Sequence, residues 1–141
     1  MESRKVLFLC TGNSCRSQMA EAIVNARLGE QWQAFSAGVQ PAGYVHPKAI
    51  AALAEIGIQH AGESKSPNEL RSLDFDLVVT VCDDAAESCP VWMGKGQRVH
   101  LGFPDPAKAD GADDQIMQVF RSVRDDIEYK VIELLKSWVS T

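Results

Sequence analysis

The stretch VLFLCTGNSCRSQMAEAIV, from Val6 to Val24, changes character twice. A continuous apolar run ends at Cys10, a polar loop follows, and apolar residues at helical spacing resume after Arg16. The first part predicts a short buried strand, and the last part predicts a helix that Gly29 ends. Cys10 and Arg16 therefore stand at the two ends of the loop in a strand–loop–helix junction.

This junction has the chemistry of an anion site. The start of a helix leaves backbone N–H groups without intrahelical partners and adds about half a positive charge. We expect Gly12 to allow the tight turn of the loop, and Arg16 to add a planar fork of donors for a tetrahedral oxyanion. A thiol in this field ionises readily, so Cys10 is expected to be a thiolate beneath the oxyanion. Ser17 can donate a hydrogen bond to that thiolate, and Asn13 can brace the loop.

A simpler interpretation makes Cys10 an inert strand-end residue and Arg16 a surface charge. The spacing Cys-x5-Arg-Ser at such a junction favours function instead. We therefore expect the oxyanion to bind Arg16 and the backbone amides of the whole loop, which comprises Thr11, Gly12, Asn13, Ser14, Cys15, Arg16 and Ser17. The side chain of Cys15 is expected to have a packing role.

Strand and helix patterns alternate along the rest of the chain. Apolar and β-branched runs predict strands at residues 5–10, 34–39, 75–82 and 98–103. Helical spacing predicts helices from Ser17, from Pro47 to Gly57, and along an apolar stripe from Ile116 to Trp138. The alternation predicts a single α/β domain over residues 1–141, with a parallel sheet covered by helices on both faces. Ligands of such sheets bind at the carboxyl ends of the strands, which Cys10, Cys82 and Asp105 all follow.

Composition excludes several classes of protein. The 141 residues carry a formal net charge of −5, which argues against non-specific binding to nucleic acid. No apolar run approaches the roughly 18 residues of a membrane span, and the run Val6–Cys10 is shorter than the roughly 7–15 residues of a secretion signal. The sequence therefore predicts a cytoplasmic protein that binds neither nucleic acid nor membrane. The four cysteines, Cys10, Cys15, Cys82 and Cys89, lack the usual spacing of a zinc site.

Two further features suggest chemistry at the same sheet edge. Cys82 ends a predicted strand, and the six residues before Cys89 favour a helix start, which would hold the two thiols too far apart for a disulfide. A disulfide between them requires this segment to unwind, which suggests a redox switch. Asp105 lies between Pro104 and Pro106, which fix its backbone direction. Its carboxyl group is either a general acid or an ordinary turn aspartate.

The motifs LCTGNSCRSQMAEA, VHPKAIAAL, VTVCDDAAESCP, GFPDPA and FRSVRDDI together resemble the arsenate reductases built on the low-molecular-weight protein tyrosine phosphatase fold. The resemblance covers nearly the whole chain and implies a four-stranded parallel sheet. It also implies reduction of arsenate to arsenite in arsenical detoxification, with Asp105 as the acid and Cys82 and Cys89 as the resolving and terminal thiols. Thioredoxin or glutaredoxin would be the reductant, phosphate and sulfate would compete with arsenate, and the protein would be a monomer without metal or other cofactor.

Departures and alternatives accompany this resemblance. Ala107 and Lys108 stand where phosphatases of this fold usually carry aromatic residues, so a slot for a phosphotyrosine ring is poorly supplied. Lys65 aligns with an aspartate that helps some of these reductases hold potassium, so we expect no potassium dependence. A phosphatase that uses Cys10, Arg16 and Asp105 is the alternative enzyme. A thiol-based sensor or oxyanion-binding module without turnover is a third interpretation.

Overall fold

The computed structural model describes residues 4–38, 41–70, 72–82 and 96–138. The helices and strands follow one another along the chain as β1 (Arg4–Cys10), α1 (Arg16–Arg27), β2 (Trp32–Gly38), α2 (Pro47–Glu55), β3 (Leu77–Thr80), β4 (Gln97–His100) and α3 (Asp113–Ser137). Two short 3₁₀ helices, η1 (Pro67–Leu70) and η2 (Pro106–Lys108), lie in the connections. The helix start that the sequence predicts between Cys82 and Cys89 lies outside the described residues.

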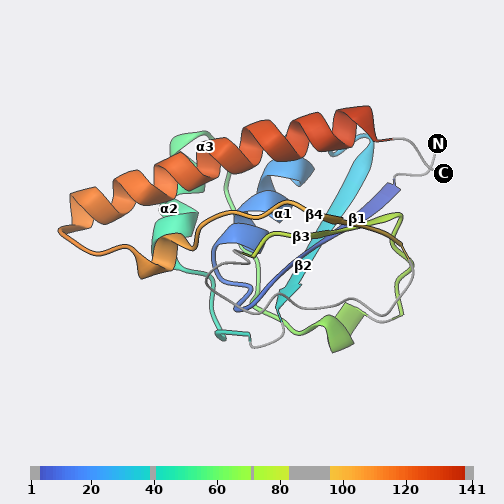
Figure 1. Cartoon of the computed structure of the whole chain (residues 1–141), viewed down its shortest axis with the longest axis horizontal. Helices are drawn as coiled ribbons and strands as arrows, with labels where there is room; N and C mark the ends of the chain where they lie inside the picture. The colour runs from blue at the N-terminus through green and yellow to red at the C-terminus, as the bar shows by residue number, and fades with distance from the viewer. Residues whose placement is uncertain (1–3, 39–40, 71, 83–95, 139–141) are drawn as a thin grey trace.

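The four strands form one parallel sheet in the order β2-β1-β3-β4 (Figure 1). This confirms the predicted α/β fold with a four-stranded parallel sheet. β3 and β4 are each shorter than the apolar runs that predicted them. Residue 10 of β1 pairs with Gly38, the last residue of β2, so both strands end at the same edge of the sheet.

Side chains of β1 alternate between two cores, as the period of a strand requires. Val6, Phe8 and Cys10 belong to the core that also contains the buried residues of α1, α2 and α3. Leu7 and Leu9 belong to a smaller core on the other face, where Leu70 of η1 and the segment after it pack. Figure 1 shows α3, in orange to red, running along one side of the molecule with α2 crossing behind its first half.

The α2–α3 contact includes a buried cation. Arg124 of α3 is 8% exposed and donates from Nη1 to the carbonyl oxygen of Ala52 at 2.9 Å and to Oε1 of Glu55 at 2.9 Å. Its Nε donates to Asp125 at 2.8 Å. Arg121 binds the same Glu55 carboxylate from solvent, with Nη2 2.8 Å from Oε2. Arg124 therefore satisfies the carbonyl group of Ala52 near the end of α2, where no further helical N–H is available.

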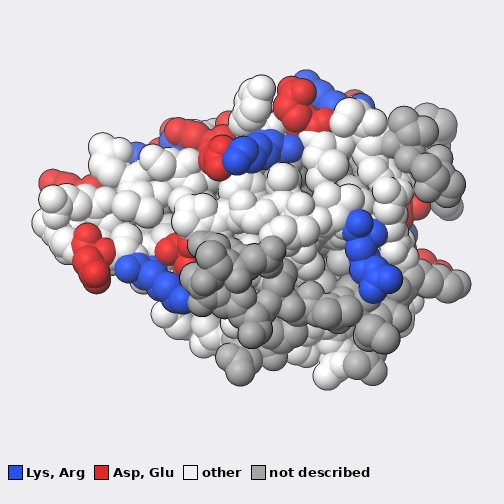
Figure 2. Space-filling view, viewed as in Figure 1, with Lys and Arg blue, Asp and Glu red and all other residues white. Residues whose placement is uncertain are grey.

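The described surface carries both signs of charge. Figure 2 shows lysine and arginine side chains interspersed with aspartate and glutamate on the visible face, with no extended basic area on its described part. Among the described residues, no helix is both long enough and apolar enough to cross a membrane.

Candidate active site

Neighbouring strands bring Cys10 and Cys82 to one edge of the sheet. Cys10 is the last residue of β1, and the N–H of Val81 donates to the carbonyl oxygen of Leu9 at 2.8 Å just beyond the end of β3. Cys82 follows at once, and both cysteines are buried, at 2% and 0% exposure. The parallel pairing of β1 with β3 thus sets two cysteines that are 72 residues apart in sequence at adjacent strand ends.

The loop between Cys10 and Arg16 turns its carbonyl groups outward. Each carbonyl oxygen from residue 12 to residue 15 accepts a hydrogen bond from outside the loop. That of Gly12 accepts from Ala42 N and Ser64 Oγ, and that of Asn13 accepts from Gln18 Nε2. Those of Ser14 and Cys15 accept from His46 N and Met19 N, respectively. The N–H of a planar trans peptide points opposite to its C=O, so the amides of residues 13–16 face the inside of the loop. The N–H of Asn13 accordingly donates to Cys10 Sγ at 3.2 Å. Inward amides at a helix start have the geometry that the predicted anion cradle requires.

The conformation of the cradle depends on Asn13 and Gly38, and not on Gly12 as predicted. Asn13 has a left-handed backbone with φ 49°, a region that asparagine tolerates better than most residues. An added Cβ at Gly12 would meet only Ala42 Cβ, at 3.9 Å. An added Cβ at Gly38 would lie 2.5 Å from the carbonyl oxygen of Thr11 and 2.7 Å from Asn13 N. The end of β2 therefore supports the cradle from behind, and only glycine fits there.

The backbone N–H of Lys65 determines which groups donate hydrogen bonds toward Cys10, because it fixes the orientation of the Asn13 side-chain amide. The N–H of Lys65 donates to the side chain of Asn13 at 2.9 Å, so the accepting atom must be the amide oxygen Oδ1. The Nδ2 of Asn13 then donates to Ser17 Oγ at 2.8 Å. Because Ser17 Oγ accepts that bond, its own hydrogen is available for Cys10 Sγ, which is 2.8 Å away. Cys10 Sγ thus has two hydrogen-bond donors, Ser17 Oγ and the N–H of Asn13.

Arg16 lies between the cradle and the loop after β4. Its guanidinium is buried and donates from Nη1 to the carbonyl oxygen of Phe103 at 3.2 Å, while Nη2 lies 3.7 Å from Oδ2 of Asp105. The other carboxylate oxygen of Asp105 accepts from the N–H of Ala107 at 3.0 Å as the N-cap of η2. The structure therefore brings Asp105 beside the arginine of the cradle, with its side chain 21% exposed.

Cys15 and His46 are near this site with different roles. Cys15 is a free, buried thiol, and burial, with the nearby Asp105 carboxylate, raises its pKa to about 12. It is therefore a neutral packing group, as the sequence predicts, and does not compete with Cys10. His46 is the N-cap of α2, where its Nδ1 accepts from Lys48 N at 3.1 Å, and burial lowers its pKa.

The two cysteines with predicted redox roles, Cys82 and Cys89, are described only in part. Cys82 is disulfide-bonded, whereas Cys10 and Cys15 are both free thiols, so neither of them is its partner. Cys89 lies outside the described residues. Within the described residues, no group of three or more His, Cys, Asp or Glu side chains is placed to hold a metal ion.

The model of the low molecular weight phosphotyrosine protein phosphatase family matches residues 5–140. The chain belongs to this family. It is 46% identical to an arsenate reductase of Halalkalibacterium halodurans over 132 residues, which cover 93% of this chain and 94% of that protein. Among solved structures, an arsenate reductase from Archaeoglobus fulgidus superposes with a TM-score of 0.75 at 36% identity, covering 94% of this chain and 99% of that one. A low molecular weight protein tyrosine phosphatase from T. tengcongensis gives 0.73 at 27% identity, covering 96% and 100%.

Behind the cradle of this family member lies a buried polar cluster that sequence reasoning largely missed. Its central carboxylate is Glu21 of α1, whose pKa burial raises. Glu21 Oε1 accepts from Ser36 Oγ at 3.0 Å and lies 3.9 Å from Lys65 Nζ, so the ammonium of Lys65 does neighbour a half-buried carboxylate. The side chains of Gln18 and His60 complete the cluster. Gln18 and Glu21 lie within the quoted motif LCTGNSCRSQMAEA, but no pattern along the chain links them to Ser36 of β2 or to His60 in the segment after α2.

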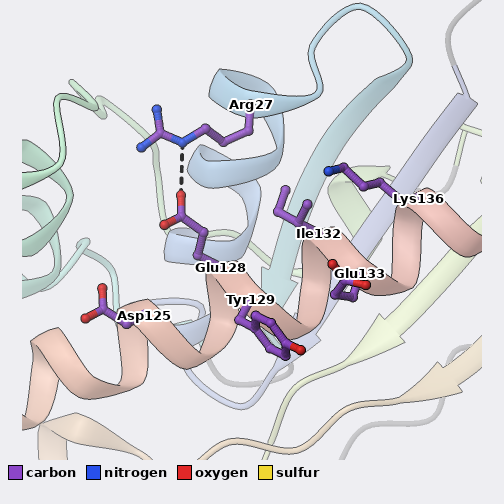
Figure 3. Close-up of a pocket in the computed structure, with 7 residues that line it drawn as sticks. All are labelled: Arg27, Asp125, Glu128, Tyr129, Ile132, Glu133 and Lys136. Carbon is purple, nitrogen blue, oxygen red and sulfur yellow. Dashed lines mark hydrogen bonds and ion pairs between the residues drawn. The ribbon is translucent and has the colours of Figure 1, made fainter.

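A separate surface hollow of about 410 Å³ lies between α1 and α3, remote from the cradle. It is lined by Arg27, Asp125, Glu128, Tyr129, Ile132, Glu133 and Lys136. Figure 3 shows Glu128 pointing to Arg27, and their ion pair measures 2.9 Å. Its lining residues include no cysteine, so the cradle at the sheet edge remains the candidate reactive centre.

Proposed function

We propose that this enzyme reduces arsenate to arsenite with a cascade of three thiols and draws its electrons from thioredoxin. One structural observation carries the proposal: the cradle nucleophile Cys10 and a second buried cysteine, Cys82, lie at the carboxyl ends of adjacent strands. A phosphatase needs only the first of these. The relatives named arsenate reductase, which match more than nine-tenths of the chain, support the same substrate.

In the first step arsenate binds to the inward amides of the loop and to Arg16. The Cys10 thiolate attacks arsenic, an S–As bond forms, and one As–O bond breaks. Asp105 lies beside Arg16 and protonates the departing oxygen, which leaves as water. The product is a Cys10–S–As(V) adduct in which arsenic has not yet been reduced.

The next two steps move electrons through sulfur. The Cys82 thiolate attacks Cys10 Sγ, so that an S–S bond forms and the S–As bond breaks with its electron pair on arsenic. Arsenic leaves as As(III) arsenite, and the two thiols have supplied two electrons. Cys89 then attacks Cys82, which releases Cys10 as a thiolate and leaves a Cys82–Cys89 disulfide. A thioredoxin dithiol reduces this disulfide. That Cys82 is disulfide-bonded while Cys10 is a free thiol is consistent with the last of these states.

The test is arsenate-dependent NADPH oxidation in the presence of thioredoxin and thioredoxin reductase. We expect turnover with the wild type and its loss in Cys82→Ser and in Cys89→Ser. Hydrolysis of p-nitrophenyl phosphate, measured in the same variants, reports whether the cradle and Cys10 are intact and should be retained. Arsenate-driven oxidation that survives either substitution would contradict the cascade. Replacing thioredoxin by glutaredoxin and glutathione identifies the reductant.

Phosphoester hydrolysis is the second candidate, because the cradle, Arg16 and Asp105 do not by themselves distinguish phosphate from arsenate. The similarity to a phosphatase structure at 27% identity supports it as a side activity. A protein whose main activity is hydrolysis would show no arsenate-driven NADPH oxidation and would be indifferent to the loss of Cys82 and Cys89.

A further inference from the structure

Gln18 is a fully buried amide in the second residue position after Arg16, and its contacts converge on the cradle. Its Nε2 donates to the backbone oxygen of Asn13 at 3.2 Å and to Oδ1 of the same residue at 3.0 Å. The same nitrogen donates to the carbonyl oxygen of Glu63 at 2.8 Å. Three oxygen acceptors fix the orientation of the amide, because a flipped side chain would set oxygen against oxygen.

Asn13 connects the hydrogen bonds of Gln18 to the nucleophile Cys10. Its N–H donates directly to Cys10 Sγ, and its side chain donates to Ser17, which in turn bonds Cys10 Sγ. Asn13 also has a left-handed backbone, a conformation that costs free energy unless neighbouring contacts hold it. Gln18 binds both the backbone and the side chain of Asn13. It therefore fixes the geometry of the two hydrogen bonds that Cys10 Sγ makes, one with the N–H of Asn13 and one with Ser17 Oγ.

The other end of the Gln18 amide is held by a histidine. His60 Nε2 lies 2.7 Å from Gln18 Oε1, and because that oxygen can only accept, Nε2 must carry the hydrogen. Burial and the nearby Lys65 both lower the pKa of His60, which favours the neutral ring. Glu21 Oε2, at 3.9 Å from Nε2, is the opposing charge in this cluster.

Gly62 leaves the space that this hydrogen bond needs. An added Cβ there would lie 2.4 Å from His60 Nε2 and 2.5 Å from Gln18 Oε1, directly against the two bonded atoms. A methyl group at residue 62 would therefore push the pair apart without altering either side chain.

We propose that Gln18 is a positioning residue for the Cys10 nucleophile, and that His60, as its Nε2–H tautomer, fixes the Gln18 amide. The inference rests on the proposed function only in taking Cys10 as the nucleophile. It adds a second layer to the site, joining the segment after α2 to the reactive sulfur through Gln18 and Asn13. The hydrogen bonds and the ion pair described for Arg16 and Asp105, the charged pair of the site, involve no residue of this layer, and these substitutions alter neither side chain.

The test measures how fast iodoacetamide alkylates Cys10 as a function of pH in the reduced protein. Fragment ions separate Cys10 from Cys15, which share one tryptic peptide. In Gln18→Met we expect the midpoint of the profile to rise by about one pH unit, so that alkylation below the midpoint is about tenfold slower. His60→Phe and Gly62→Ala should shift it in the same direction by less, whereas His60→Gln, which keeps an N–H donor, should stay near the wild type.

The core variant Val24→Ala is the control for general loosening of α1, because Val24 is fully buried and outside the site. A shift in Val24→Ala as large as that in Gln18→Met would overturn the proposal, as would unshifted profiles in folded Gln18→Met, His60→Phe and Gly62→Ala. If Gln18→Met does not fold, the two remaining variants decide. Nitrogen-15 NMR supplies an independent reading, since a neutral His60 protonated on Nδ1 would also overturn the inference. None of these measurements uses arsenate, so they can fail while the NADPH assay succeeds, and the reverse.

Discussion

Replacing Gly38 by alanine tests whether the oxyanion cradle is supported rigidly from behind. The added methyl would lie 2.5 Å from the carbonyl oxygen of Thr11, 2.7 Å from Asn13 N and 2.9 Å from the carbonyl carbon of Gly12. All three are backbone atoms of the cradle, so no side chain can rotate away to make room. Either β2 or the loop must move by several tenths of an ångström.

Overpacking of this kind costs about 1–3 kcal/mol of unfolding free energy. If the inward amides of the cradle are displaced, the protein also binds the oxyanion more weakly. Every 1.4 kcal/mol of lost binding free energy raises the dissociation constant about tenfold. Gly12→Ala is the matched comparison, because its added methyl meets only Ala42 Cβ, at 3.9 Å. Its lower unfolded-state entropy should leave stability unchanged or raise it by about 0.4–1 kcal/mol.

Urea denaturation of both variants measures stability, and calorimetric titration with phosphate measures the affinity of the Gly38→Ala cradle. We expect Gly38→Ala to lose about 1–3 kcal/mol and to bind phosphate about tenfold or more weakly than the wild type. Equal stability of the two alanine variants, together with wild-type phosphate affinity in Gly38→Ala, would refute the idea that β2 holds the cradle in place.

Three other predictions concern charge. Burial lowers the pKa of His46 and of His60 from the usual 6.5, so the folded state binds fewer protons than the unfolded state just below that pH. The unfolding free energy should therefore fall as the pH drops below about 6.5, and urea titrations should show a shallower fall in His60→Gln; an identical slope would contradict this. The Lys65 ammonium lies beside the half-buried Glu21 carboxylate. Arsenate-driven NADPH oxidation should therefore run equally fast in potassium and sodium chloride at equal ionic strength, and a clear rise in potassium would exclude this role. Arg124→Met should lower the unfolding free energy measured in urea by about 1–3 kcal/mol, because it leaves a buried carbonyl group unpaired. Arg121→Met, at an exposed position, should lower it by less than about 1 kcal/mol. Equal losses in the two variants would contradict this role of Arg124.

Local periodicity was sufficient to predict the parallel α/β fold. The apolar run that ends at Cys10 became β1, and the apolar stripe near the end of the chain became α3. The predicted ends of strands were less accurate where pairing with neighbouring strands decides them. The run from Phe75 to Cys82 is apolar throughout, yet β3 comprises only Leu77–Thr80, because a strand ends where its ladder partners end.

The sequence by itself determined that Cys10, Arg16 and Ser17 share one strand–loop–helix junction, and it predicted their roles in the site, because the chemistry of such a junction is local. Only the tertiary structure decided what holds them. Asn13, and not Gly12, has the left-handed backbone, and the support comes from Gly38 and His60, on other segments of the chain. The physical reason is that hydrogen-bond direction and close packing are properties of groups that meet in space. Gln18 and His60 are 42 residues apart, and no pattern along the chain records that their side chains meet.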